Sequence, residues 1–347
     1  MTLRGKIPAL LFALAMVAAA CGDASPTDEI SSEADEQPSE AATPTSTSST
    51  VAETTTAPPI EDSETQAEDS ETDVDSDGTL TSAPIGEVEL VLLDAGAEPR
   101  TELRMDIPDG TTQTMVMEQQ QTIVQEVGGQ VLQEIETSTI TKAELVTATV
   151  EGGYLITSTI VEAEAAPDSD PAIAAQMTAA LQASVGITSQ VQVDYWGNLL
   201  SNEIGGTEGL DTTSNEVVQS TSQLSAPLPT DPVGVGARWE LTQPLDLLGI
   251  NTTQTTVYTL TAIDGPVLTL EAVISQTVEE GSTFEQGGME IEVVSWLSTG
   301  EGNMQVDLSS MVPTSTAISS ALQELALPGS DDVLKQSIDV VIKTSAE

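Results

Sequence analysis

Alternation of apolar and polar residues is the feature that most constrains the fold of this chain. Residues 144–164 and 255–278 are rich in Val, Ile, Leu and Thr and alternate with a period of two, and an acidic residue followed by glycine divides each segment, at 151–153 and 264–265. A period of two places successive side chains on opposite faces of a strand, so that one face can be buried. Two such strands around an acid–Gly turn are typical of a β-hairpin.

Helix signals are fewer. A helix is predicted where Pro171 occupies a first helical position and Gly186 follows the last turn. Its apolar stripe consists of Ile173, Met177, Leu181 and Val185. Residues 211–224 form a weaker helix candidate, and residues 315–327 suit a helix or a strand equally well.

Two further alternating segments, 111–127 and 289–308, complete the pattern of strands. Strands outnumber helices throughout, and the hairpins favour antiparallel pairing. The predicted fold class is therefore mainly β: a curved antiparallel sheet or partial barrel with one or two helices packed on one face.

Residues 1–20 have the composition of a secretory signal peptide. Two basic residues, Arg4 and Lys6, precede an apolar run over 7–17 and a series of small residues that ends at Ala20. The apolar run is too short for a comfortable membrane span. We therefore expect export.

The residues that follow offer two routes of cleavage. The run "VAAAC" before Gly22 resembles a bacterial lipobox, with Ala18 in place of the usual Leu, and Cys21 would be lipidated. Cys21 is the only cysteine, so no disulfide can form within the chain, and lipidation supplies a reason for a lone thiol. We expect a lipid anchor at the outer face of the bacterial cell membrane. The alternative is ordinary cleavage after Ala20, which would give a plain secreted protein.

The composition divides the rest of the chain in two. Residues 21–85 are dominated by Ser, Thr, Pro, Ala and acidic residues, whereas residues 86–347 are rich in Val, Ile, Leu and Thr. The first segment cannot bury enough apolar surface to offset its ordering entropy, and like charges extend it. We predict a disordered acidic linker over 21–85 and a β-rich globular domain over 86–347.

Charge excludes one class of partner. The chain carries 8 basic and 56 acidic residues and no histidine. Two of the basic residues lie in the leader, so the remainder has six against 56, a formal charge of −50. Binding to nucleic acid requires a basic surface, and none can be assembled here.

Catalytic motifs are equally scarce. Without histidine, and with one cysteine in the predicted anchor, the Ser-His-Asp and Cys-His arrangements cannot form, and zinc loses its usual ligands. A pair of carboxylates could still hydrolyse a glycoside, but the sequence singles out no pair. We expect neither an enzyme nor a cofactor.

One acidic segment resembles the opening of a calcium loop. Asp73, Asp75 and Asp77 alternate before Gly78, as hard oxygen ligands do in such loops. The twelfth position, however, is Pro84 rather than glutamate. The simpler interpretation is an acidic linker that happens to alternate, which leaves these three residues as a weak calcium candidate.

The glycine-containing stretch "LPTDPVGVGARWE" resembles a phosphate-binding loop only superficially. Prolines precede it, no lysine is present, and a strand-like segment follows instead of a helix. We predict a turn in which Gly234 and Gly236 let the backbone bend and Trp239 docks in the core. Core packing is likewise preferred to ligand stacking for Tyr195 and Trp196.

Four residues in this stretch, Pro229, Val233, Gly236 and Trp239, match a Pro-x-x-x-Val-x-x-Gly-x-x-Trp element. It is similar to an element of an uncharacterised family of bacterial secreted and lipid-anchored proteins. "MVMEQQQTIVQEVGGQ", "VDYWGNLLS" and "TGEGNMQVDL" agree with this resemblance, which spans about residues 100–345. The motif residues would be structural, and the family has no activity to transfer.

A looser, architectural resemblance is to the lipid-carrying lipoproteins of the mycobacterial envelope, which use a curved sheet with helices on its concave face. Two functions follow as hypotheses. The first is a cell-surface lipoprotein that acts as a structural or protein-interaction module of the envelope, with an unknown protein partner. The alternative is a carrier or binder of a lipid or other apolar ligand.

Overall fold

The computed structural model describes most of the predicted domain. The described residues are 81–82, 88–167, 169, 171–205, 226–247, 250–279, 281–286, 289–327 and 332–347. The predicted signal peptide, Cys21, the calcium candidate Asp73, Asp75 and Asp77, and the helix candidate 211–224 lie outside them.

A single antiparallel sheet makes up most of the described chain. Its strands are β1 (Thr81–Ser82), β2 (Glu89–Asp94), β3 (Thr112–Val127), β4 (Gln130–Val150), β5 (Gly153–Ala165), β6 (Thr188–Asp194), β7 (Leu199–Gly205), β8 (Arg238–Leu247), β9 (Ile250–Asp264), β10 (Val267–Val278), β11 (Thr283–Gln286), β12 (Met289–Asp307), β13 (Thr314–Ala326) and β14 (Val333–Ala346). The spatial order is β1-β7-β6-β5-β4-β3-β14-β13-β12-β10-β9-β8-β2, and β11 pairs with β12. Both predicted hairpins are confirmed, as β4–β5 and β9–β10.

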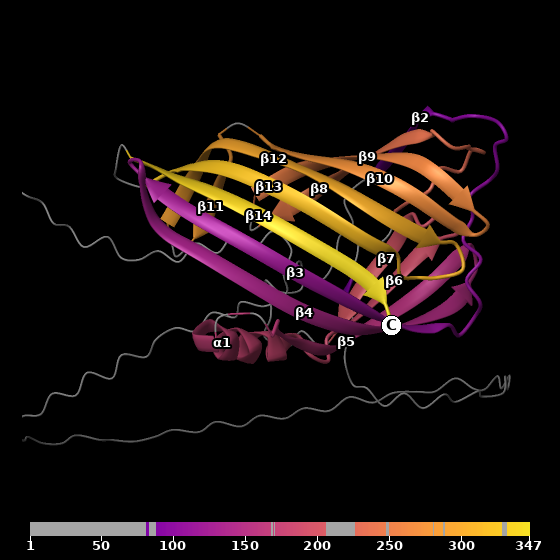
Figure 1. The fold of residues 1–347 in the computed structure, drawn as a ribbon, viewed down its shortest axis with the longest axis horizontal. Coiled ribbons are helices and arrows are strands. Elements are labelled where there is room, and N and C mark those ends of the chain that lie inside the picture. Colours follow the sequence, from indigo (N-terminus) through magenta and orange to yellow (C-terminus); the bar gives the residue numbers. More distant parts are fainter. Residues whose placement is uncertain are drawn as a thin grey trace, which may run out of the picture. The chain divides into compact units, whose positions relative to one another are not determined.

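Two meanders meet in the middle of this sheet. The first runs outward from β3 to β7, and the second runs inward from β8 to β14. Strands β3 and β14 pair along almost their whole lengths, from Leu334 opposite Val127 to Ala346 opposite Met115. This β3–β14 seam joins segments that are about two hundred residues apart in sequence, and it lies across the front of Figure 1.

The sheet must curl because one short segment reaches both of its edges. Strand β1 pairs with β7 and β2 pairs with β8, at opposite ends of the strand order. Twelve inter-strand steps in a flat sheet would separate them by about 58 Å. The seven residues from Ser82 to Glu89 can span at most about 25 Å. The predicted mainly β, curved antiparallel sheet is confirmed, and it remains open between its two edge strands.

One α-helix, α1 (Pro171–Leu181), packs at the β5 side of the sheet and continues into the 3₁₀ turn η1 (Gln182–Ser184). Leu181 is fully buried and Met177 packs beside it, against Ile160, Ala163, Ile187 and Ile204. The hydroxyl of Thr178 accepts a hydrogen bond from the backbone N–H of Ala165 at 3.1 Å. Val185 lies beyond the helix and is exposed, so the apolar stripe is shorter than predicted.

The segment that suited a helix or a strand is a strand. Residues Thr314–Ala326 form β13 between β12 and β14. The odd-numbered side chains Ala321, Gln323 and Leu325 are buried, while Leu322 is exposed. Neighbouring strands on both sides therefore outweigh the helical propensity of its Ala, Leu and Glu residues.

The two largest apolar clusters on the buried face contain Trp239 and Phe284. The Trp239 cluster consists of Leu103, Ala226, Leu228, Val233, Ala237, Trp239, Leu241, Tyr258, Leu260, Leu268, Leu270 and Ala272. The Phe284 cluster consists of Ile250, Phe284, Ile291, Val293, Leu325 and Leu334. Trp196, in the β6–β7 turn, packs against the Trp239 cluster. The turn between the last strands of the first meander thus contacts the second meander, which is direct evidence of the curvature.

Candidate functional site

The motif stretch forms one half of a clamp between two loops. The N–H of Gly234 donates to the carbonyl of Ala95 at 2.9 Å, and the N–H of Ala97 donates to the carbonyl of Val235 at 2.9 Å. Thr101 and Val233 exchange two further backbone hydrogen bonds. A Cβ on Gly234 would overlap the carbonyl oxygen of Ala97, so the approach requires glycine there.

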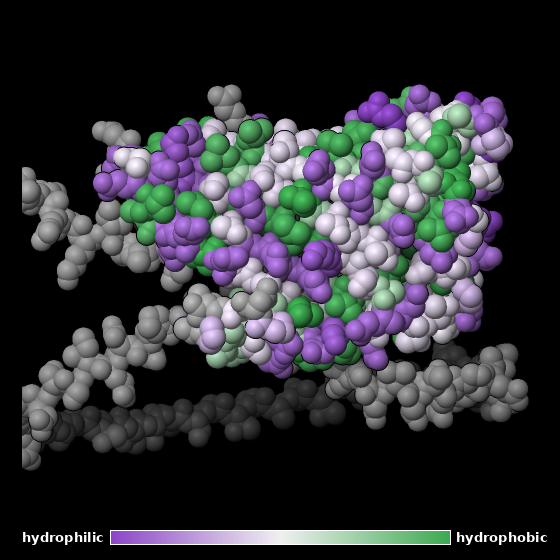
Figure 2. All heavy atoms as spheres, viewed as in Figure 1, coloured by the Kyte–Doolittle hydropathy of each residue, from purple (hydrophilic) through white to green (hydrophobic). Residues whose placement is uncertain are grey.

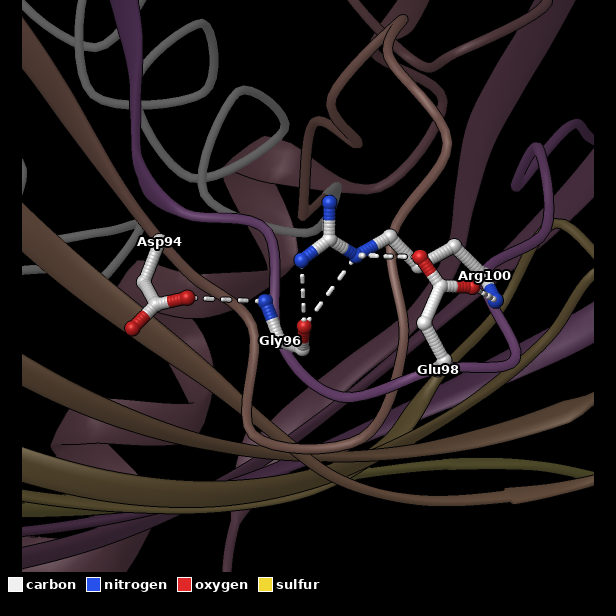
Figure 3. Close-up of polar contacts among 4 residues, drawn as sticks. All are labelled: Asp94, Gly96, Glu98 and Arg100. Carbon is white, nitrogen blue, oxygen red and sulfur yellow. Dashed lines mark hydrogen bonds and ion pairs between the residues drawn. The ribbon is translucent and has the colours of Figure 1, made fainter.

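The other half of the clamp is held in shape by a compact polar turn, drawn in Figure 3. The Asp94 carboxylate accepts from the N–H of Gly96 at 2.9 Å. The Arg100 guanidinium donates to the Gly96 carbonyl through Nε at 3.1 Å and Nη2 at 2.8 Å, and it lies 3.6 Å from Glu98. These hydrogen bonds and the ion pair all join residues of the turn to one another.

Trp239 anchors the clamp in the core. Its side chain is 0% exposed, and its Nε1–H donates to the carbonyl of Pro227 at 2.9 Å. The ring stacks on Tyr258 with centroids 5.6 Å apart and planes 24° apart. Burial raises the pKa of Tyr258 to about 12, because the phenolate cannot be solvated there.

The other three motif residues have equally local roles. Pro229 and Val233 are buried, and Gly236 adopts a φ of +88°, which glycine tolerates best. All four motif residues thus contact the chain itself, and they bring no charged or nucleophilic group together.

A cleft lies beside the segment that follows the clamp in the chain. The segment 102–111, here called the strap, runs from the clamp to the β4–β5 hairpin. Along it, the N–H of Met105 donates to the carbonyl of Tyr195 at 2.9 Å, and the N–H of Gly110 donates to the carbonyl of Thr147 at 2.8 Å. The cleft between the strap, β5 and the β6–β7 turn has a volume of about 530 Å³. Its lining residues are Arg104, Met105, Asp106, Ile107, Thr149, Tyr154 and Tyr195.

Two tyrosines and an arginine organise this strap cleft. The Arg104 guanidinium lies 3.8 Å from the centroid of the Tyr195 ring, a cation–π contact. Tyr154 meets Tyr195 edge to face, with centroids 5.4 Å apart and planes at 86°. The Tyr154 hydroxyl donates to the carbonyl of Met105 and accepts from the N–H of Ile107, each at 3.1 Å. The strap is therefore fixed against the two rings.

Arg104 differs from most basic residues of the described chain in its charge partners. Arg100, Lys142, Lys335 and Lys343 lie within 4 Å of Glu98, Glu162, Glu324 and Glu118, respectively. The hydrogen bond and charge of Glu162 raise the pKa of Lys142, and Glu324 raises that of Lys335 in the same way. Within the described residues, Arg104 and Arg238 form no ion pair. Arg104 lines the strap cleft, and Arg238 is not among the residues that line it.

The buried face between the apolar clusters is polar. Gln323, Gln336, Gln125 and Gln133 lie opposite one another on β13, β14, β3 and β4, and we call them the amide row. Gln323 is 0% exposed, and neither its Oε1 nor its Nε2 has a hydrogen-bond partner within the described part of the chain. The row lies between a layer containing Ala321, Ile338 and Ile123 and a layer containing Leu325, Leu334 and Val127.

Neither the cleft nor the amide row was identified by sequence reasoning. Tyr195 was expected in the core; it lies in the turn after β6, where it is half-buried and packs against the cluster that contains Tyr154 and Val193, and it also lines the strap cleft. The scarcity of basic residues could have drawn attention to Arg104. Glutamines at 119, 121 and 125, all on the same face of β3, were the available signal for a polar buried face.

No group of three or more His, Cys, Asp or Glu that could hold a metal ion occurs among the described residues. In the same part of the chain, no helix has the length and apolarity needed to cross a membrane.

A family model matches the part of the chain that contains the motif. A model of a family of unknown function (DUF6263) matches residues 209–312, a range that includes all four motif residues and "TGEGNMQVDL". The segments "MVMEQQQTIVQEVGGQ" and "VDYWGNLLS" precede the matched range, so the similarity covers less of the chain than the resemblance in the sequence suggested. No curated protein matches the chain.

Proposed function

We propose that this chain is an exported lipoprotein, anchored through Cys21 at the outer face of the bacterial cell membrane, that binds a small polar ligand in the strap cleft. The observation that carries the binding role is Arg104, a charged guanidinium held on an aromatic ring at the mouth of a cleft and without an ion pair in the described chain. The volume of about 530 Å³ is in the range of small-molecule sites. No catalytic role is proposed.

The amide row disfavours the alternative of an apolar carrier. A lipid chain lying on the buried face would leave the amides of Gln323, Gln119 and Gln121 against hydrocarbon. Leaving a buried polar group unpaired costs about 1–3 kcal/mol for each group. The strap cleft, which combines rings with charged groups, suits a polar ligand better.

Native mass spectrometry of the full chain, extracted gently from its membrane, tests the binding role. We expect a small molecule to remain bound to the unmodified chain and to be lost from an Arg104→Gln variant. Arg238→Gln is the matched control, because Arg238 also has no ion pair in the described chain but lies outside the cleft. Equal retention by all three proteins would contradict a site at Arg104.

The anchor is tested separately. Cys21→Ser should move the chain from the membrane fraction to the soluble fraction, because the thiol is the proposed acceptor of the lipid. Continued membrane retention of the variant would contradict lipidation at this residue.

A protein-interaction role is the second candidate, and one feature of the outer face favours it. Leu297 and Leu322 lie directly opposite each other on β12 and β13 and are 63% and 47% exposed. Val273 and Ile318 are also exposed, and Glu301 lies opposite both of them. Figure 2 shows such apolar residues among hydrophilic ones on this face. The fitting partner is an envelope protein with an apolar patch rimmed by basic residues.

Cross-linking from position 322 in intact cells would identify such a partner. The complex should weaken as salt screens Glu301, and Leu297→Ser should weaken it further. A partner captured equally well by the Leu297→Ser variant would contradict this surface.

A further inference from the structure

The strap cleft contains two opposite charges. Arg104 and Asp106 lie two residues apart on the strap, and both are exposed and line the cleft. The two side chains form no salt bridge with each other within the described residues. The cleft therefore offers a ligand one cationic and one anionic contact on the same wall.

Each of these charges is held by its surroundings. The guanidinium carbon of Arg104 lies 3.8 Å from the centroid of the Tyr195 ring, and the side chain is exposed, so its N–H groups can reach a ligand. A planar fork of this kind matches a carboxylate with two parallel hydrogen bonds. The backbone of Asp106 is fixed by its N–H, which donates to the carbonyl of Leu308 at 2.7 Å. The guanidinium of Arg104 and the backbone of Asp106 are therefore held in place, while the Asp106 carboxylate is exposed to a ligand.

Most of the other lining residues are apolar or aromatic, and Thr149 adds a hydroxyl. Tyr154, Tyr195, Met105 and Ile107 line the same cleft, and the Tyr154 hydroxyl is already engaged with the strap backbone. An apolar or aromatic side chain of a ligand can pack there, while its charged groups reach the strap.

The charge of the whole chain selects among ligands. A formal charge of −48 repels a simple anion on its approach, and Asp106 would repel it again inside the cleft. Asp106 would accept a simple cation, but Arg104 would oppose it. A ligand with both charges and no net charge escapes both penalties.

From these contacts we infer that the strap cleft binds a zwitterion of the amino-acid type. Arg104 takes its carboxylate, Asp106 takes its ammonium group, and the tyrosines contact its side chain. This inference rests on the proposed binding role of the cleft and adds the chemical class of the ligand.

Isothermal titration of the full chain in detergent, with three matched probes, tests the inference. The probes are L-phenylalanine, phenylacetate and phenethylamine, which present both charges, the carboxylate alone and the ammonium alone. We expect L-phenylalanine to bind at least about tenfold more tightly than either single-charge probe, since each lost charge-assisted contact is worth roughly 1.5 kcal/mol or more.

Variants separate the two charges. Arg104→Gln should weaken L-phenylalanine binding at least about tenfold, and Arg104→Lys should restore part of it, because the charge returns without the fork. Asp106→Asn should weaken L-phenylalanine binding and strengthen phenylacetate binding. Arg238→Gln, outside the cleft, should change neither. Raising the salt concentration should favour phenylacetate more than L-phenylalanine, because only phenylacetate is repelled as a net anion.

These experiments distinguish a wrong ligand class from a wrong binding role. Equal binding of phenylacetate and L-phenylalanine, with no effect of Asp106→Asn, would overturn the zwitterion and leave an anion site at Arg104. If none of the probes binds while mass spectrometry finds another molecule lost with Arg104→Gln, the ligand class is wrong and the binding role stands. If no probe binds and no molecule is retained, both proposals fail.

Discussion

The Trp239 cluster and the amide row lie on the same buried face of the sheet, and they differ in how their buried polar atoms are paired. In the cluster, most side chains are apolar, and the indole N–H of Trp239 is hydrogen-bonded. In the row, Gln323 is buried just as completely with both amide atoms unpartnered in the described chain. Burial alone therefore does not measure stabilisation, because the first arrangement gains hydrophobic free energy and the second loses solvation.

The positions of the two regions explain the difference. The cluster joins the clamp, the strap and β8, where a few backbone hydrogen bonds between loops add to the packing. The row crosses the β3–β14 seam, where strand pairing already holds the backbone. A polar layer between two apolar layers penalises a two-residue slip of the seam, which would keep the same face buried but set glutamines opposite apolar side chains.

The largest effect should come from emptying the cluster. We expect Trp239→Ala to lower the free energy of unfolding by about 3–5 kcal/mol, through the lost ring, its hydrogen bond and the cavity left behind. Urea denaturation followed by circular dichroism measures it. Trp296→Ala, at a half-buried ring opposite Gln323, is the comparison and should cost less. Equal losses would remove the distinction between the two regions.

The clamp beside the cluster should be nearly as sensitive. Gly234→Ala places a methyl group on the Ala97 carbonyl and should destabilise by about 3 kcal/mol. Gly236→Ala meets no atom within 4 Å and only strains a left-handed backbone, at about 1–2 kcal/mol. Thermal unfolding of both variants ranks them, and the reverse order would contradict the close approach of the two loops.

Alkaline pH should weaken the cluster through Tyr258. Its pKa is raised in the folded state, from 10.0 to about 12. The stabilisation is therefore complete below pH 10 and is lost as the pH rises through 12. The loss should be on the order of 2–3 kcal/mol. Urea midpoints at pH 9 and pH 12 should differ less in Tyr258→Phe than in the unmodified chain. An identical pH dependence would show that another group is responsible.

Relieving the amide row should have the opposite sign. Gln323→Met replaces two unpartnered polar atoms with an apolar group of similar size and should raise the free energy of unfolding by about 1–2 kcal/mol. Gln133→Met, at the half-buried end of the same row, should change it little. Destabilisation by Gln323→Met would mean that the amide is satisfied in solution.

The outer face of the same strands should matter least. Lys335 contacts Glu324 at 2.7 Å, and their hydrogen bond lowers the pKa of Glu324 and raises that of Lys335. Both groups are solvated, so Lys335→Met should leave the urea midpoint nearly unchanged. A large shift would show that surface charge contributes more to the β13–β14 pairing than the exposure of these two side chains allows.

The sequence predicted the elements of the fold better than their arrangement. Alternation located the hairpins around 151–153 and 264–265 because that signal is local. It did not settle β13, whose composition suits both structures and whose strand neighbours decide. Nor did it predict the β3–β14 seam, since alternation records which face is buried but not which strand is the partner.

The candidate site escaped prediction for the same reason. Arg104 and Tyr195 are about ninety residues apart, and only the strap brings them within 3.8 Å. The motif around Trp239 was correctly expected to turn into a strand, and that local role left nothing for it to contribute to the cleft. The conspicuous motif residues therefore pack in the scaffold. The residues that line the cleft belong to no motif, and folding alone brings them together.

The seam also sets the order in which the chain can fold. During synthesis the N-terminus emerges first, so β3 leaves the ribosome long before its partner strand β14. Until Val333–Ala346 has followed, one long edge of β3 is unpaired, and such edges recruit strands from other chains. The first meander must therefore stay protected or partly unfolded until β14 has been synthesised. The whole sheet can form only after that strand pairs with β3.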